Sequence, residues 1–146
     1  MQITTRSRYS TRALVEIAEK QHLSPVSIKS ISRKQDIPEK YLETLFKQLK
    51  IAGIVKSIRG AGGGYILAKP PAELSVWEIV VAVEERVTAT DCIYDSACCQ
   101  RTLECATRDV WSRLERTVKG LLSSISLSDL VDMQASRRSA AFDFHI

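Results

Sequence analysis

The chain has 146 residues, of which 45% are hydrophobic and 26% charged, as expected for one globular domain with its own core. Its amino terminus lacks the apolar stretch of a secretory signal, and its longest apolar run, Ile79 to Val83, is far too short to span a bilayer. These features exclude a membrane-spanning chain and predict a cytoplasmic protein, in which thiols stay reduced.

Charge is distributed unevenly along the chain. Residues 1–70 contain 13 Lys and Arg against 5 Asp and Glu, a formal charge of +8, whereas the remainder carries 8 against 12, or −4. A basic half joined to an acidic half favours a polyanion-binding module attached to a part that does not bind polyanions. Nucleic acid is the natural candidate, although a solvated charged surface would explain the charge alone equally well.

Three helices are predicted at the start of the chain. Apolar residues at helical spacing predict an amphipathic helix over 9–20, Ser27 can cap a short helix that ends near Asp36, and Pro38 opens a third helix. Gly53 stands where a left-handed cap would end the third helix. The core-facing positions of that helix recur at i, i+3, i+4 and i+7: Leu42, Leu45, Phe46 and Leu49.

A hairpin is predicted after the third helix, because strand-like runs over 54–59 and 65–68 flank a glycine-rich turn. Helix, short helix, helix and hairpin together predict a winged helix-turn-helix, in which the second helix of the pair reads the major groove. Arg59, at the wing tip, is placed to enter a narrow minor groove. A phosphate loop is a poorer interpretation, since no Lys-Ser/Thr pair follows the glycines. The candidate DNA contacts are Lys40, Tyr41, Glu43, Thr44, Lys47 and Arg59, with a packed core aromatic as the equal alternative for Tyr41.

The second half of the chain predicts a different part. Ser75 to Glu78 matches a capping box that opens a helix to about Glu85. A long helix from about Thr107 carries a near-heptad apolar stripe: Val110, Trp111, Leu114, Val118, Leu121 and Leu122. Dimerisation is favoured over packing on its own domain, and it would present two recognition helices to a pseudo-palindromic site with half-sites about one or two helical turns apart.

The predicted fold is therefore mainly α with a small β-hairpin wing, a winged helix-turn-helix plus a long dimerisation helix. We expect the DNA-binding domain over 1–85, a cysteine loop over 86–106, the dimerisation helix and a short terminal helix over 107–132, and a flexible tail over 133–146.

All four cysteines fall in that one loop: Cys92, Cys98, Cys99 and Cys105. Crowded thiols in a reducing compartment indicate metal or redox chemistry before structural disulfides, and soft thiolates favour iron–sulfur clusters or zinc. A zinc ribbon is poorly supported, because the loop has no C-x-x-C knuckle. A metal-free thiol sensor, in which Cys98 or Cys99 oxidises, remains an alternative.

The chain resembles the winged-helix transcription regulators that include the iron–sulfur regulator IscR, the nitric oxide sensor NsrR and the cysteine-metabolism regulator CymR. The resemblance covers 9–131 and rests on Tyr41-Leu42-Glu43, Leu45-Phe46, Leu49, the segment Val55 to Leu67, the segment Cys105 to Trp111, and Leu127-Ser128-Asp129-Leu130. It implies a dimeric DNA-binding repressor or activator, places Tyr41, Glu43 and Arg59 at positions used in DNA recognition, and implies an iron–sulfur cluster on three cysteines of the loop.

By this resemblance the cluster ligands are Cys92, Cys98 and Cys105, with Cys99 as the alternate middle ligand because the loop has one extra residue. A 2Fe-2S cluster is favoured, with 4Fe-4S as the alternative. The position of the IscR-type histidine ligand holds Arg108, which is permanently protonated and does not normally ligate iron, so the fourth ligand is unidentified. The candidates are Cys99, Asp95, Glu104, Asp109 or an amino-terminal residue of a partner subunit, whereas His22 and His145 are expected at the surface.

Together these observations predict a homodimeric DNA-binding transcription regulator whose operator affinity is modulated by the cluster. An enzyme is the weakest interpretation, since no Ser/His/Asp or paired-carboxylate constellation stands out. The remaining alternative is a regulator controlled by a metabolic enzyme that docks on the acidic half, by analogy with CymR.

Overall fold

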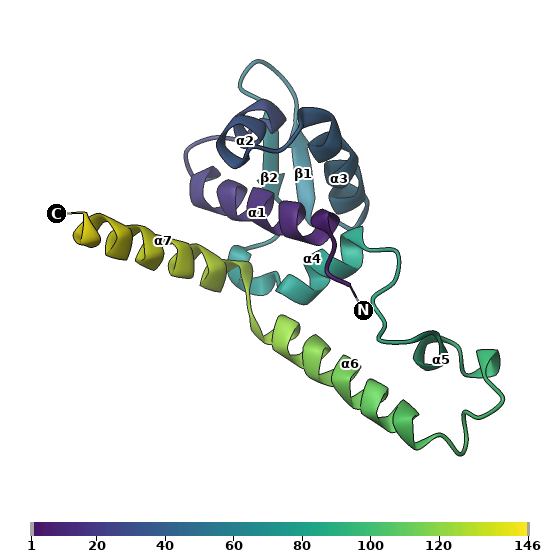
Figure 1. Cartoon of the computed structure of the whole chain (residues 1–146). Helices are drawn as coiled ribbons and strands as arrows, with labels where there is room; N and C mark the ends of the chain where they lie inside the picture. The colour runs from purple at the N-terminus through teal and green to yellow at the C-terminus, as the bar shows by residue number, and fades with distance from the viewer. Residues whose placement is uncertain (1, 146) are drawn as a thin grey trace.

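Helices dominate the structure, a computed structural model that describes residues 2–145 (Figure 1). The elements follow in the order α1 (Thr5–Lys20), α2 (Ile28–Gln35), α3 (Glu39–Ile51), β1 (Val55–Ile58), β2 (Gly64–Leu67), η1 (Pro71–Glu73), α4 (Val76–Val83), α5 (Asp91–Tyr94), η2 (Ser96–Cys98), α6 (Ala106–Ser124) and α7 (Leu127–Phe144). Within residues 2–145 no helix is long and apolar enough to cross a membrane.

Local capping signals set the ends of the first helices. The Ser27 side chain accepts a hydrogen bond from the Ser30 backbone N–H and begins α2, which ends at Asp36 in a left-handed conformation. Pro38 precedes α3, and Gly53 has a φ of 72°, so the predicted opening and cap of the third helix are both confirmed. The first helix begins earlier than predicted because the Thr4 hydroxyl accepts from the Arg6 N–H and caps it.

The core lies between α1, α3, α4 and the hairpin. Leu14 and Ile17 of α1, Phe46 of α3 and Ile79 of α4 are fully buried, and burying each such side chain is worth roughly 1.5–3 kcal/mol. The Phe46 ring meets the Tyr65 ring of β2 edge-on at 4.7 Å. The predicted core face of α3 is confirmed, since all four of its members are buried: Leu42, Leu45, Phe46 and Leu49.

A buried carboxylate ties α2 to α1. The side chain of Glu16 in α1 is fully buried. Its carboxylate pairs with Lys20 on the same helix and with Lys34 of α2 at 2.8 Å. Burial alone would raise the pKa of Glu16, but the two ammonium groups outweigh it and hold the pKa below its ordinary value. The charge therefore stays on Glu16, and its ion pair with Lys34 holds the end of α2 against α1.

The hairpin depends on close backbone approach. β1 and β2 are antiparallel, with Val55 opposite Leu67 and Ile58 opposite Gly64. The segment before α2 joins the edge of β2, since the Val26 N–H donates to the Tyr65 carbonyl at 3.0 Å and the Tyr65 N–H donates to the Val26 carbonyl at 2.8 Å. A Cβ at Gly64 would lie 2.5 Å from the Val26 carbonyl oxygen, so only glycine lets β2 reach this segment.

The second half of the chain leaves the core and returns to it. The predicted capping box at Ser75 is present and begins α4, which ends at Val83, two residues before the predicted end. After the cysteine loop, α6 crosses beneath α4, and Leu127 at the start of α7 is again fully buried, with its N–H bonded to the Leu74 carbonyl at 2.8 Å. Figure 1 shows α6 carrying the loop outward, away from the wing.

The carboxyl-terminal part of the chain differs from the prediction of a short helix and a flexible tail. Residues 133–144 continue α7 as one helix that passes along α1 (Figure 1). Ser126 and Asp129 form a capping box at its start, and Gln134 and Arg138 both donate to Glu19 of α1 at 3.0 Å. The prediction missed these bonds because they join residues more than a hundred positions apart.

Candidate nucleic-acid interface and cysteine loop

One face of α3 presents the side chains predicted to contact DNA. Four of them are exposed on the side of the helix opposite the core, and they alternate with the buried leucines: Lys40, Glu43, Thr44 and Lys47. The Thr44 hydroxyl donates to the Lys40 carbonyl of its own helix at 3.2 Å, so its oxygen remains available as an acceptor. The face therefore offers two cations, a carboxylate and a hydroxyl group on one rigid helix.

Tyr41 has a different environment from these neighbours. Its ring is half-buried and meets the Tyr9 ring of α1 edge-on, with 5.8 Å between centroids and 88° between planes. The structure thus places Tyr41 at the joint between α1 and the start of α3. Packing explains its aromatic body, and only its hydroxyl end is free for another contact.

The wing adds a cation beside this face. Arg59 is exposed at the end of β1, directly before the glycine turn, which is closed by a hydrogen bond from the Gly63 N–H to the Gly60 carbonyl at 3.0 Å. The Lys50 ammonium donates to the Ser57 hydroxyl at 2.9 Å and ties the end of α3 to β1. The end of α3 and the wing are therefore held to each other.

Most cations of the basic half are free to meet a polyanion. Of the thirteen Lys and Arg residues in 1–70, nine have no carboxylate partner within residues 2–145, Lys40, Lys47 and Arg59 among them. Solvated charges that serve only solubility are commonly interspersed with the opposite sign. An excess of unpaired cations over α2, α3 and the wing is the electrostatic footprint of nucleic-acid binding.

The cysteine loop lies at the outer end of α6, far from the wing (Figure 1). Side chains of α6 hold its first part: the Thr88 hydroxyl and the Ala89 N–H donate to the Glu115 carboxylate at 2.9 and 3.0 Å. Further along, the guanidinium Nε of Arg108 donates to the Cys92 carbonyl at 3.3 Å. The loop also contains α5 and η2, short elements that its sequence does not announce.

The four thiols are free and differ in their surroundings. Cys98 is exposed, whereas the other three cysteines are half-buried. Desolvation, and then the negative charges of Asp95 and Cys92, raise the pKa of the Cys98 thiol. The Thr107 hydroxyl, 3.1 Å from the Cys105 sulfur, and the backbone at Arg108 lower the pKa of Cys105. The pKa values of Cys98 and Cys105 are therefore shifted in opposite directions, and Cys105 forms a thiolate more readily than Cys98.

The donor chemistry of the loop fits an iron–sulfur cluster, because thiolates are the ligands such clusters take. The arrangement is not that of an assembled site, since within residues 2–145 no three His, Cys, Asp or Glu side chains are gathered closely enough to hold a metal ion. The histidines stay outside: His22 and His145 are both exposed, as predicted.

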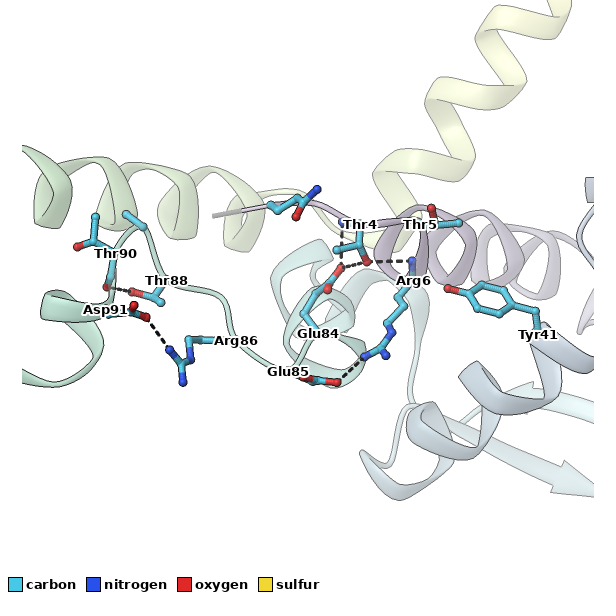
Figure 2. Close-up of a pocket in the computed structure, with 12 residues that line it drawn as sticks. Thr4, Thr5, Arg6, Tyr41, Glu84, Glu85, Arg86, Thr88, Thr90 and Asp91 are labelled. Carbon is cyan, nitrogen blue, oxygen red and sulfur yellow. Dashed lines mark hydrogen bonds and ion pairs between the residues drawn. The ribbon is translucent and has the colours of Figure 1, made fainter. Parts of the chain in front are cut away.

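A cavity of about 710 Å³ lies where the loop meets the DNA-binding module (Figure 2). Its walls come from the amino-terminal segment, Tyr41, the end of α4 and residues 84–91. Its charged groups are paired with one another, Arg6 with Glu85 at 3.3 Å and Arg86 with Asp91 at 2.6 Å. These pairs join residues of the amino-terminal segment and of 84–91 to each other, and the cavity marks the junction between the loop and the DNA-binding module.

The Glu84 carboxylate makes the central hydrogen bonds of this junction. Glu84 caps α4 and accepts hydrogen bonds from the Thr4 N–H at 3.1 Å, the Thr4 hydroxyl at 2.7 Å and the Ser7 hydroxyl at 2.5 Å. Burial would raise the pKa of Glu84, but these donors outweigh it and hold the pKa below its ordinary value. A carboxylate at the root of the cysteine loop is thus bonded to the first turn of α1.

Comparison with known proteins identifies the family. The family model described as Rrf2, iron-dependent transcriptional regulator, matches residues 3–133. The chain belongs to the Rrf2 family. IscR of Photorhabdus laumondii, an HTH-type transcriptional regulator, is 41% identical over 134 residues, which are 92% of this chain and 81% of that protein.

Solved structures of the Rrf2 type share the fold. CymR of B. subtilis, described as its global cysteine regulator, superposes with a TM-score of 0.77 at 34% identity and covers 91% of this chain and 98% of its own. T. potens IscR gives a TM-score of 0.75 at 32% identity, with 92% and 88% covered. The expected family and its winged-helix fold are confirmed, and this Rrf2 protein is a DNA-binding transcription regulator rather than an enzyme, as are the relatives named here.

Sequence reasoning missed the bonds that join the two parts of the molecule. Glu84, Glu115 and Arg108 each act on residues that are 16 to 80 positions away. A helix that ends in an acidic residue before a loop gives no sign of its partner. Of these three residues, the sequence draws attention only to Arg108, because it occupies the position of the IscR-type histidine ligand.

Proposed function

We propose that this Rrf2 regulator is a cytoplasmic homodimer that binds a pseudo-palindromic operator, with an affinity modulated by an iron–sulfur cluster. The DNA contacts are those of α3 and the wing: Lys40, Tyr41, Glu43, Thr44, Lys47 and Arg59. The cluster, of the 2Fe-2S type in preference to 4Fe-4S, is held by Cys92, Cys98 and Cys105, with Cys99 as the alternate. The free cations around α3 support the DNA-binding half of this proposal, and the four free thiols on one loop support the cluster half.

The apolar stripe of α6 supports dimerisation. Val110 and Leu121 are 57% and 59% exposed, and Trp111 and Leu114 are also exposed, so a row of large apolar side chains faces solvent in the single chain. Exposing a contiguous apolar surface of this kind is costly in water, and a second copy of the helix is the natural cover for a near-heptad stripe. Two copies joined through α6 carry two recognition helices, as a symmetric operator requires.

The observation that carries the modulation is the bonding of Glu84 to Thr4 and Ser7. A movement of segment 88–92 together with α6, which holds it through Glu115, would pull first on residues 84–86, because they lie directly before that segment. The Glu84 carboxylate transmits that shift to the first turn of α1, and Tyr9 of α1 packs on Tyr41 at the start of α3. A contiguous set of bonds and packed rings therefore leads from the loop to the recognition helix.

When bound, the cluster would supply a redox-active iron centre held by thiolates, and incomplete cysteine ligation would make it labile, as suits a sensor. The residues of this chain supply the response. Since the thiols are not gathered in the structure, holding a cluster would require the segment around Cys98 to approach Cys92 and Cys105, and the resulting strain would act on segment 88–92 and on residues 84–86 before it. Whether the cluster raises or lowers DNA affinity depends on whether the cluster-loaded or the cluster-free arrangement of α3 fits the operator half-site better.

A metal-free thiol sensor is the second candidate function. It is favoured by the lowered pKa of Cys105 and by the exposure of Cys98, because an accessible thiol and a readily formed thiolate are what oxidation requires. In this case oxidation of a cysteine, rather than loss of iron, would move the loop.

The test compares DNA affinity with and without the cluster. Duplexes are selected by the protein from a random-sequence library, once with the cluster-loaded form and once with the cluster-free reduced form, and the affinity of both forms for the selected duplexes is measured by fluorescence anisotropy at fixed salt. We expect a difference of about 5- to 150-fold, the usual range of an allosteric coupling. Equal affinities of the two forms for every selected duplex would contradict modulation by the cluster.

A further inference from the structure

Arg108 occupies the position at which the IscR-type pattern has a histidine ligand. In this structure its side chain makes a hydrogen bond to the backbone of the cysteine loop. Its guanidinium Nε donates to the Cys92 carbonyl at 3.3 Å, in a partly buried contact across 16 residues. Its backbone N–H donates to the Cys105 carbonyl at 3.1 Å. That backbone bond belongs to the first turn of α6, which Cys105 precedes, so the Arg108 side chain ties the backbone of Cys92 to the helix that begins after Cys105.

A second contact on the same face of α6 reinforces this one. Glu115 lies seven residues, or about two helical turns, beyond Arg108, so both side chains project from one side of the helix. Glu115 accepts from the Thr88 hydroxyl and the Ala89 N–H, and Arg108 binds the carbonyl of Cys92. The segment 88–92 is therefore attached to α6 at both of its ends.

The middle of the loop has no comparable attachment. Around Cys98 and Cys99 the side-chain hydrogen bonds are local: the Thr102 hydroxyl lies within bonding distance of the Ser96 and Cys99 carbonyls, and Asp95 accepts from the Ala97 N–H. Within residues 2–145 no side-chain hydrogen bond joins 95–102 to α6. The loop consequently has one pair of cysteines tied to α6, Cys92 and Cys105, and a middle pair, Cys98 and Cys99, with no such side-chain attachment within residues 2–145.

We infer that Arg108 is a positioning residue that holds Cys92 and Cys105 in fixed relation before any metal binds. This inference rests on the proposed function, because these two cysteines would be two of the three cluster ligands. An arginine is permanently protonated, so it cannot compete with the thiols for iron, and its planar fork is suited to hold a carbonyl in a defined direction. Where the IscR-type pattern has a histidine ligand, this chain has an arginine whose side chain holds the Cys92 backbone to α6. We call this contact the Arg108 clasp.

The test uses the reduced, metal-free protein, in which the clasp acts and the cluster plays no part. Hydrogen exchange of the peptides that span 88–94 and the alkylation rate of each cysteine by iodoacetamide are measured by mass spectrometry. In Arg108→Met we expect exchange at 88–94 and alkylation of Cys92 to become about tenfold faster, near the low end of the factor for loss of one hydrogen bond from a charged donor. Cys98 is already exposed, so its alkylation rate should not change.

Arg113→Met is the matched control, because Arg113 is exposed on the same helix, carries the same charge and makes no side-chain bond within residues 2–145. Arg108→Lys keeps the cation with a different donor geometry and should give an intermediate rate. The core of α1, α3 and α4 lies apart from residue 108, and a far-UV circular dichroism spectrum unchanged from wild type establishes that each variant is folded. Exchange and alkylation in Arg108→Met equal to wild type would overturn the clasp.

Reconstitution with iron and sulfide then separates the two claims. Slower cluster assembly in Arg108→Met than in Arg113→Met would support a positioning role toward the cluster. If the wild-type protein takes up no cluster although Arg108→Met loosens segment 88–94, the clasp stands and the proposed cluster fails. If the wild type and Arg108→Met assemble a cluster at the same rate, Arg108 has no role toward it.

Discussion

Replacing Arg59 by glutamate should weaken operator binding by about 10- to 100-fold and reduce the slope of log affinity against log salt by about 1 for each lost wing contact. Arg59 is exposed beside the glycine turn and has no carboxylate partner within residues 2–145, so its charge is free for DNA. A narrow minor groove attracts an inserted cation and repels a carboxylate. Fluorescence anisotropy titrations at several salt concentrations measure both quantities.

Arg137→Glu is the control for this variant. It changes the net charge by the same amount on an exposed position of α7, away from α3 and the wing. Arg137→Glu should lower operator affinity only by the small amount that the change in net charge causes at long range. An isotherm of Arg59→Glu that matches wild type at every salt concentration would remove the wing from the DNA interface.

Replacing Leu114 by aspartate should convert the proposed dimer to a monomer and reduce operator affinity by about 10²- to 10⁴-fold, the range gained when two linked modules bind together. Leu114 lies in the middle of the exposed α6 stripe, and the new carboxylate would be buried without a partner in a helix pair. The core does not include this side chain, so the winged module should remain folded. Sedimentation equilibrium gives the mass, and anisotropy gives the affinity.

Ser123→Asp places the same charge on an exposed position of α6 outside the stripe and should leave the mass of the dimer unchanged. A Leu114→Asp protein that sediments as a dimer would show that α6 is not the contact. A monomer that keeps wild-type operator affinity would instead show that one recognition helix suffices for binding.

The order of elements in the winged module could be predicted because its signals are local. Ser27, Pro38, Gly53 and Ser75 each act within a few residues, and the spacing of the leucines in α3 marks its core face regardless of what packs on it. The stripe of α6 was equally visible, since a period is a property of one segment. These features required no knowledge of the rest of the chain.

The junction and the last helix depend on contacts that no local pattern contains. Glu84 meets Thr4 across 80 residues, and Arg138 meets Glu19 across 119. The end of the chain has small and charged residues that are typical of a tail, yet a capping box and those contacts make it helical. The cysteine spacing predicted the ligand types, but it could not show that Arg108 and Glu115 attach the loop to α6.

Iron and acid-labile sulfide per chain, together with the visible absorption of protein purified without oxygen, test the central claim most directly. The account predicts a brown protein with nearly equal iron and sulfide, and a Cys92→Ala variant that stays colourless because it lacks one of the three thiolate ligands. A variant that kept its colour would refute the assignment of Cys92. A wild-type protein that stays colourless and free of iron after attempted reconstitution would contradict the cluster and favour thiol oxidation or a docked partner as the signal.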